Sequence, residues 1–379
     1  MDILRKQEEI ILNSIKKEPK IIILYGPRQS GKTTLMAKIV GKLSADLGLK
    51  TLQYSGDSLD HREILGNARL DYLKSLVGAN TLLVVDEAQK IPDIGLVLKL
   101  IFDHLKIRII ISGSSSLELS QKVNEPLTGR SEIYYINPIS LYELDFNVLH
   151  TPQKRLEEFL IYGMYPKSVV TSITEDKATY LSNLFNNYLY KDILEFEQIR
   201  KPDKVIQLLK LLALQVGSEV SVSELARQLN MAVHTVEVYL DLLQKIFVVY
   251  KLYGFSRNLR KEISKMPKYF FYDVGMRNAL LGNFNRLENR NDVGQLFENF
   301  CVMEKIKSAE IFQTRGNFYF WRTHDQQEID VVLERGGHIA GFEFKYGIGK
   351  LPRAPKIFLE TYSASYTPVN QDNFFEMLK

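Results

Sequence analysis

Residues 21–35, with the sequence IIILYGPRQSGKTTL, constrain the fold more than any other stretch of this 379-residue chain. An apolar run ends at Gly26, and Gly31 is followed by Lys32, Thr33 and Thr34. This is the pattern G-x-x-x-x-G-K-[ST], with a buried strand expected before the loop and a helix after it. In such a loop successive backbone N–H groups point into one concavity, which together with the helix N-terminus seats a phosphate.

The loop therefore predicts a site for ATP and Mg²⁺. Lys32 would reach the β- and γ-phosphates, and the Thr33 hydroxyl would bind Mg²⁺. The nucleotide is expected to contact every loop residue, namely Gly26, Pro27, Arg28, Gln29, Ser30, Gly31, Lys32, Thr33 and Thr34. A chance glycine-rich turn is the alternative. A lysine in the first helical turn opposes the helix dipole unless an anion is bound, which favours the nucleotide site.

Two acidic residues follow a later apolar run. Strands are expected at 49–54, 81–85 and 107–112, and the second of these ends in Asp86 and Glu87. Asp86 would hold Mg²⁺, and Glu87 would orient the attacking water. Taken alone, the two carboxylates would be solvated acids at the end of a strand. Behind the phosphate loop we interpret them as the metal-binding and catalytic acids.

Two further residues are candidates for sensing or contacting phosphate. Ser114 follows the strand at 107–112 and could sense the γ-phosphate, although a helix N-cap is the alternative. Arg130, in the segment LTGR before the strand EIYYI, is the candidate arginine that reaches a phosphate. An ordinary surface arginine is the alternative for that position.

Together, the segments GPRQSGKTTL, VVDEAQ, IISGSSS and LTGR resemble a group of bacterial and archaeal AAA-type ATPases. In that group the ATPase is joined to a C-terminal domain of unknown function. Weaker similarity continues through ISLYEL, YGMYP and YLYKDI, so it covers nearly the whole chain. The resemblance implies an α/β fold with a parallel P-loop sheet, a helical lid and Mg²⁺-dependent ATP hydrolysis.

Composition limits the location and the class of protein. The net charge of +4 is too small to indicate nucleic-acid binding by itself. The single cysteine, Cys301, excludes an intramolecular disulfide and fits a reducing cytosol. No apolar run is long enough for a transmembrane helix, and the charged N-terminus lacks the apolar core of a signal peptide. We expect a cytoplasmic protein without membrane contact.

Residues 201–283 predict a winged helix-turn-helix. Helices are expected at 204–216, 222–229 and 233–246, followed by a β-hairpin formed by FVVYKLYGF and KYFFYDV. This unit has 12 basic against 7 acidic residues. Its basic side chains cluster in and between the two strands, where they could contact DNA phosphates: Lys251, Arg257, Arg260, Lys261, Lys265 and Lys268.

The third helix of this unit argues against sequence-specific DNA binding. It has no arginine, and its outward positions include Glu237 and Asp241. His234 and Thr235 are the only good candidates for contact with base edges. DNA contact through the basic strands and protein–protein contact both stay open.

The C-terminal region predicts a second chemical site. Glu298 lies on an expected helix at 293–307, and strands are expected at 318–322, 328–334 and 338–345. Gly336 and Gly337 indicate a two-residue hairpin turn, which pairs Arg335 with His338 and sets Asp330 opposite Glu343. Like charges at such positions are destabilising, so the pair indicates a divalent metal, and Lys345 shares its face.

This second set resembles the PD-(D/E)xK nuclease fold, with Ile329 in place of the proline. The resemblance implies that Glu298, Asp330 and Glu343 hold Mg²⁺, while Lys345 positions or deprotonates the attacking water. Two alternatives stay open: a solvated hairpin face with an ordinary Lys–Glu pair, and the same fold without cleavage.

These expectations divide the chain into an ATPase domain at 1–138, a helical lid or connector at 139–200, a winged helix at 201–283 and a restriction-endonuclease-like α/β domain at 284–379. Residues 282–293 are expected to be a linker. Two functions follow. The first couples ATP hydrolysis to Mg²⁺-dependent nucleic-acid processing, with DNA as a candidate partner. The second is an ATP-dependent switch with a non-cleaving interaction domain. Self-association stays open.

Overall fold

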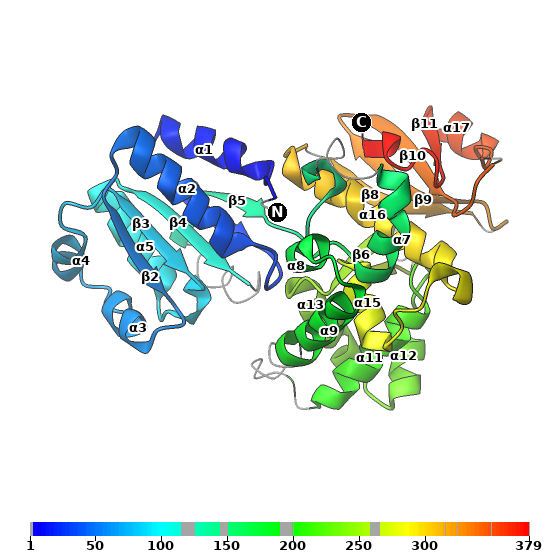
Figure 1. Cartoon of the computed structure of the whole chain (residues 1–379), viewed down its shortest axis with the longest axis horizontal. Helices are drawn as coiled ribbons and strands as arrows, with labels where there is room; N and C mark the ends of the chain where they lie inside the picture. Colours follow the sequence, from blue (N-terminus) through cyan, green and yellow to red (C-terminus); the bar gives the residue numbers. More distant parts are fainter. Residues whose placement is uncertain are drawn as a thin grey trace. The chain divides into compact units, whose positions relative to one another are not determined.

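The computed structural model describes residues 3–114, 126–144, 151–189, 199, 201–257, 266–314, 316–323, 325–349 and 351–378. These fall into two compact units. The N-terminal unit comprises residues 2–137 with 245–247, and the C-terminal unit comprises residues 138–244 and 248–379. Figure 1 shows both units, with labels on most of their helices and strands.

The N-terminal unit is built on a five-stranded parallel sheet in the order β2-β3-β4-β1-β5. Its strands are β1 (Ile21–Tyr25), β2 (Thr51–Ser55), β3 (Leu82–Asp86), β4 (Arg108–Gly113) and β5 (Ser131–Tyr135). The register aligns Tyr25 with both Gly113 and Tyr135. The parallel α/β sheet that the family resemblance implied is therefore confirmed. The carboxyl ends of its strands meet at one edge, where the phosphate loop begins.

Helices cover this sheet because its interior strand β1 is apolar on both faces. All five residues of β1 are buried. Against one face, α1 (Gln7–Lys17) and α2 (Lys32–Leu47) supply Ile11, Ile15, Leu35 and Ile39 to a core that includes Ile22 and Leu24. The remaining elements of this unit are α3 (Leu59–Leu65), α4 (Leu70–Val77), the 3₁₀ turn η1 (Ala88–Lys90) and α5 (Ile94–Leu105).

The first half of the C-terminal unit is helical. It contains the 3₁₀ turn η2 (Leu141–Glu143), then α7 (Pro152–Tyr162), α8 (Pro166–Val170), α9 (Thr174–Leu184) and the π-helical turn η3 (Phe185–Leu189). These are followed by α11 (Pro202–Leu214), α12 (Val222–Leu229) and α13 (Val233–Lys245). Buried Asp273 ties α7 and α8 to α15 (Val274–Leu281), because its carboxylate accepts from the backbone N of Met164 at 2.6 Å and caps α15 at Met276.

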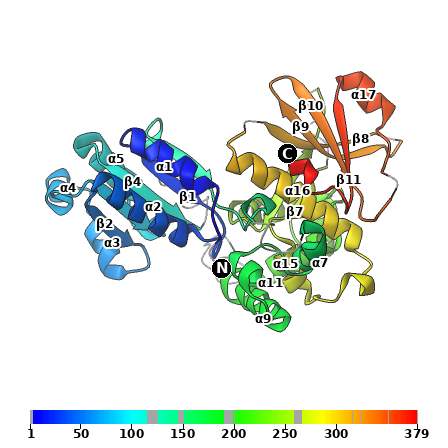
Figure 2. The ribbon, with the colours of Figure 1, turned by 45° about the horizontal axis from the view of Figure 1, so that its top comes forward.

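The second half forms a mixed six-stranded sheet in the order β11-β10-β9-β8-β6-β7. Its strands are β6 (Val249–Gly254), β7 (Lys268–Phe271), β8 (Asn317–Arg322), β9 (Glu328–Arg335), β10 (His338–Phe344) and β11 (Ser365–Val369). The 19-residue helix α16 (Val293–Ile311) contacts β7, β9 and β10. Phe358 of α17 (Lys356–Tyr362) packs on Trp321 and Ile329. Figure 2 shows this sheet with α16 and α17.

The register of the C-terminal hairpin agrees with the count from Gly336 and Gly337. His338 pairs with Arg335, and Phe342 pairs with Val331. The β6–β7 pair is antiparallel, as expected for the two basic strands. However, β6 also pairs with β8 through Tyr253 and Gly254. The strands of the third and fourth predicted domains therefore belong to one sheet.

The prediction of a linker at residues 282–293 is wrong, because Arg290 and Asp292 in this segment form ion pairs that pack it into the C-terminal unit. The Arg290 guanidinium is fully buried and donates to both Asp292 carboxylate oxygens, at 2.8 and 2.9 Å. Arg277, before this segment, donates to Asp292 at 2.7 Å and to the carbonyl of Ala213. The 3₁₀ turn η4 (Leu287–Asn289) lies in the same segment. The domain boundaries expected at 200/201 and 283/284 stay predictions.

Candidate functional site

The phosphate loop has the backbone geometry that its sequence predicts. β1 ends at Tyr25 and α2 begins at Lys32, with Gly31 in the left-handed region at φ 97°. Gly26 lies against the chain that leaves β5, so a Cβ at Gly26 would stand 2.1 Å from the carbonyl oxygen of Ile136. No larger residue fits at this position without moving the backbone.

The cation and polar groups of the loop are arranged inward. Lys32, with 5% exposure, donates from Nζ to the carbonyls of Gly26 at 2.9 Å and Pro27 at 2.8 Å. The Ser30 hydroxyl is fully buried and has no hydrogen-bond partner among the described residues. A buried cation and an unused buried donor in one loop fit a phosphate ligand. The other predicted nucleotide contacts, Pro27, Arg28, Gln29 and Thr34, are part of this loop or of the first turn of α2.

The predicted Mg²⁺ ligands lie together at the same sheet edge. The Thr33 hydroxyl donates to Oδ2 of Asp86 at 2.8 Å, and the Ser112 hydroxyl bonds to Oδ1 of Asp86. This pairing follows from the strand order, because β4 alone separates β1 from β3. A hydroxyl and a carboxylate are the hard oxygen donors that Mg²⁺ takes alongside phosphate oxygens. These residues therefore fit Mg²⁺ bound together with ATP.

Glu87 is held by two neighbours. Its backbone is in the left-handed region at φ 48°. Its Oε2 accepts from Nε2 of Gln89 at 2.6 Å and from the Ser114 hydroxyl at 3.1 Å. Ser114 is thus next to the predicted catalytic carboxylate, where we expected a γ-phosphate sensor. The fold brings Lys32, Thr33, Asp86, Glu87 and Ser114 to one edge of the sheet.

The prediction that Arg130 contacts a phosphate needs correction. It precedes β5, whose first residue, Ser131, pairs with Ile21 at the amino end of β1. The phosphate loop follows the other end of β1, about 16 Å away for a strand of this length. The Arg130 guanidinium instead forms a two-bond ion pair with Asp103, at 2.7 and 3.0 Å. Arg130 therefore cannot contact a phosphate in the loop of its own chain.

Three residues of this site were missed by the sequence analysis. Buried Arg5 donates to the carbonyl of Ser30 at 2.7 Å and to that of Asn137 at 2.9 Å, so it ties the loop to the segment after β5. Ser112 contacts Asp86, and Gln89 contacts Glu87. The position of Gln89, two residues after Glu87 in the segment VVDEAQ, was the available signal. No sequence pattern points to Arg5.

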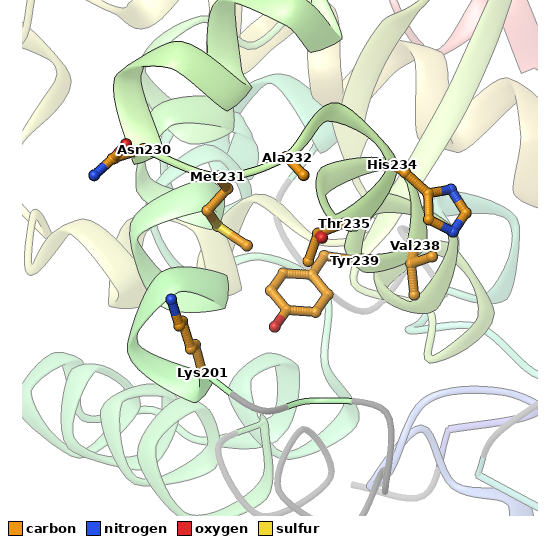
Figure 3. Close-up of a pocket in the computed structure, with 8 residues that line it drawn as sticks. All are labelled: Lys201, Asn230, Met231, Ala232, His234, Thr235, Val238 and Tyr239. Carbon is orange, nitrogen blue, oxygen red and sulfur yellow. The ribbon is translucent and has the colours of Figure 1, made fainter.

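The start of α13 borders a cavity of about 430 Å³. It is lined by Lys201, Asn230, Met231, Ala232, His234, Thr235, Val238 and Tyr239. In Figure 3, Met231, Thr235 and Tyr239 lie in the middle of the group and His234 at its edge. His234 is 88% exposed, with its Nδ1 3.9 Å from Glu237, an acidic neighbour unsuited to a DNA groove.

Of the basic residues expected to contact DNA phosphates on β6 and β7, Lys268 is buried and cannot do so. Arg257 is exposed with its guanidinium 5.5 Å from the Tyr362 ring centre, and Lys251 lies over Tyr253. Lys268, however, is 1% exposed and points into the unit. Arg260, Lys261 and Lys265 lie outside the described residues.

A carboxylate cluster forms where the C-terminal metal site was expected. Glu298 comes from α16, Asp330 from β9 and Glu343 from β10, one position beyond the recorded Phe342–Val331 pair. Oδ2 of Asp330 accepts from the backbone N of Phe344 at 2.7 Å. Lys345 follows β10 and is exposed. Sequence reasoning missed the central group, Lys268, whose Nζ is 3.4 Å from Oε1 of Glu298 and bonds to Oε1 of Glu328.

Burial and mutual repulsion raise the pKa values of these acids. Burial, followed by the charge of Asp330, raises the pKa of Glu298 to about 8 and that of Glu343 to about 8. Burial raises the pKa of Asp330 to about 6. Burial lowers the pKa of Lys268, but the charges of Glu298, Asp330 and Glu328 outweigh it and raise this pKa overall. Lys268 is therefore charged at neutral pH.

This cluster does not fit a divalent metal as it stands. Among the described residues, no group of three His, Cys, Asp or Glu side chains is arranged to hold a metal ion. The ammonium of Lys268 lies among the carboxylates that were expected to be ligands, and two of these, Glu298 and Asp330, are engaged by Lys268 or by backbone N–H. An open groove of about 800 Å³ borders the cluster, and its lining includes Glu328, Glu343, Arg353 and Lys356.

Within the described part of the chain, no helix is long and apolar enough to cross a membrane.

Three regions of the chain match models of known families. Residues 18–145 match the model described as an AAA domain. Residues 153–287 and 293–374 match two models described as domains of unknown function, DUF8612 and DUF4143.

Related proteins occur in bacteria and archaea. An uncharacterized protein of Mycobacterium tuberculosis is 30% identical over 86% of this chain and 70% of its own length. An uncharacterized protein of Methanocaldococcus jannaschii is 28% identical over 74% of this chain and 66% of its own length. The Walker-type ATPase of Pyrococcus abyssi aligns with 16% identity and a TM-score of 0.49 over 74% of this chain and 96% of its own. The chain, in which a match to an AAA domain precedes matches to two domains of unknown function, belongs to the family of the mycobacterial protein.

Proposed function

We propose that this protein hydrolyses ATP with Mg²⁺ at the phosphate loop and that the nucleotide state changes what the C-terminal unit binds. The 2.8 Å contact between Thr33 and Asp86 carries the proposal, because it joins the loop to the acidic end of β3. Lys32 would contact the β- and γ-phosphates. Mg²⁺ on Thr33 and Asp86 would neutralise phosphate charge, and Glu87 would orient water.

Replacing Lys32 by alanine tests this proposal. The substitution removes a charge-assisted contact to phosphate, so ATP affinity should fall roughly 10–100-fold, with a parallel loss of turnover. Calorimetry of ATP binding and phosphate release measure the two effects. The matched control is Lys50→Ala, because Lys50 is exposed and precedes β2 at the opposite edge of the sheet. Wild-type binding and turnover in Lys32→Ala would contradict the proposal.

Nucleic acid is our candidate partner for the C-terminal unit, through the winged helix that we propose for α11–α13, β6 and β7. Exposed Arg257 and half-buried Lys251 support phosphate contact, whereas Glu237 beside His234 opposes base recognition by α13. Binding should therefore be salt-dependent and weakly selective for sequence.

The double variant Lys251→Glu/Arg257→Glu should weaken binding to all DNA sequences alike. Because two phosphate contacts are lost, the slope of log K against log salt should fall by about 2. Fluorescence anisotropy at several salt concentrations measures the slope. Charge reversal of the exposed Lys50 and Lys74 in the N-terminal unit is the control. If the wild type binds no nucleic acid at low salt, the partner is a protein instead.

Nucleic-acid cleavage by the carboxylate cluster is the second candidate function. The groove lined by Glu328, Glu343, Arg353 and Lys356 supports the phosphate-binding part of this function, because its cations suit a phosphate ligand beside the cluster. Cleavage of this type would need Glu298, Asp330 and Glu343 to bind a divalent ion, with Lys345 near the attacking water. The non-cleaving switch requires no metal at the cluster.

A further inference from the structure

Lys268 lies in the part of the cluster that a metal would need. It begins β7, the edge strand of the sheet, whereas the acids come from α16, β9 and β10. Its side chain passes the Phe320 ring, with Nζ 5.3 Å from the ring centre, to reach Glu298 and Glu328. The backbone of Lys268 is fixed by pairing with Leu252 and by a bridge to Glu219. This arrangement places the ammonium at a set position inside the unit.

The acids around Lys268 are held in place as well. A Cβ at Gly217, where φ is 77°, would stand 2.7 Å from Oε2 of Glu298, so the turn between α11 and α12 closes on this carboxylate. Glu328 also lies 3.9 Å from Nε of Arg322. A buried ammonium and buried carboxylates each need the other, because either charge alone is costly to remove from water. Lys268 provides a positive charge for the buried carboxylates, so the cluster does not require a metal for this purpose.

We propose that Lys268 is the resident cation of this cluster and that it excludes a divalent metal while β7 is in the sheet. An ion bound by Glu298 and Asp330 would lie next to the ammonium and be repelled by it. The C-terminal unit in this conformation therefore does not cleave nucleic acid. The groove that Glu328 and Glu343 share with Arg353 and Lys356 stays open to a ligand. This inference bears on the second candidate function and does not depend on ATP hydrolysis.

The test is metal-dependent stability of the full chain without nucleotide, because Mg²⁺ at Thr33 and Asp86 depends largely on ATP phosphates. Mn²⁺ serves as the probe, by calorimetry and thermal unfolding. Wild-type protein should show no Mn²⁺ binding at the cluster and no shift in Tm. Lys268→Met should lower the Tm of metal-free protein and then gain roughly 5–10 °C when Mn²⁺ is about 100-fold above its Kd.

Two further variants keep the test decisive if Lys268→Met folds poorly. Lys268→Arg retains the cation, so, like the wild type, it should not bind Mn²⁺ at the cluster and its Tm should not change with Mn²⁺. Lys268→Met/Asp330→Asn should lose the metal response of the single variant. The inference is overturned if wild-type protein binds Mn²⁺ and Asp330→Asn alone abolishes that binding. It is also overturned if folded Lys268→Met, with the ammonium gone, still fails to bind Mn²⁺.

Discussion

Glu87→Gln should slow ATP hydrolysis roughly 10²–10⁴-fold while ATP still binds. The amide has nearly the shape of the carboxylate but cannot accept a proton from the attacking water. The phosphate contacts come from other residues, Lys32 and Thr33, so affinity should stay close to that of the wild type. Single-turnover phosphate release, measured beside ATP-binding calorimetry, separates the two effects.

The surroundings of Glu87 sharpen this expectation. Gln89 and Ser114 both donate to Oε2 of Glu87, so these two contacts orient the carboxylate. Glu9→Gln is the matched control, because Glu9 is exposed on α1. Unchanged hydrolysis in Glu87→Gln would remove Glu87 from the catalytic role and leave the water to another group.

Asp292→Asn should destabilise the C-terminal unit by about 3–5 kcal/mol, as expected when one partner of a buried ion pair is lost. The Asp292 carboxylate neutralises the fully buried guanidinium of Arg290 and that of Arg277, which is 3% exposed. The substitution removes the only carboxylate that pairs with these two buried guanidinium groups among the described residues. Urea unfolding at neutral pH, followed by a probe in the C-terminal unit, measures the loss. Asp176→Asn, at an exposed position of α9, should change stability by less than about 0.5 kcal/mol.

The stability lost in Asp292→Asn should also depend on pH. Burial raises the pKa of Asp292, but hydrogen bonds from Arg290 and Arg277 outweigh it and lower that pKa to about 2. A depressed pKa contributes stability above the unfolded value, near 4, which is lost as pH falls towards 2. The stability difference between wild type and Asp292→Asn should therefore narrow in this acidic window. A difference that stays constant with pH would show that the carboxylate charge is not the source.

The arrangement of the candidate nucleotide site was largely predictable because its residues lie at strand ends. Once the apolar runs are assigned as parallel strands, Thr33 and Asp86 must meet at one edge. The prediction for Arg130 was wrong although the sequence places it before β5, because in a parallel sheet that position lies at the amino edge and the phosphate loop at the carboxyl edge. Gly336 and Gly337 specified the C-terminal register because a two-residue turn leaves no freedom in pairing. Lys268 could not be assigned from sequence, since a lysine on a hairpin edge ordinarily points to solvent, and its burial depends on β6 joining β8.

The shared strand β6 has a consequence for how this protein can be divided. It pairs with β7 on one side and β8 on the other, so a fragment beginning at residue 284 would leave β8 as a bare edge. Exposed edges of this kind recruit strands from other molecules. The same cut would remove Lys268, whose charge lowers the pKa values of Glu298 and Asp330, so both carboxyls would shift further towards their protonated forms. A biochemical study of the C-terminal chemistry therefore needs the polypeptide from about residue 138 onward, and a shorter piece would report on an artefact of its own truncation.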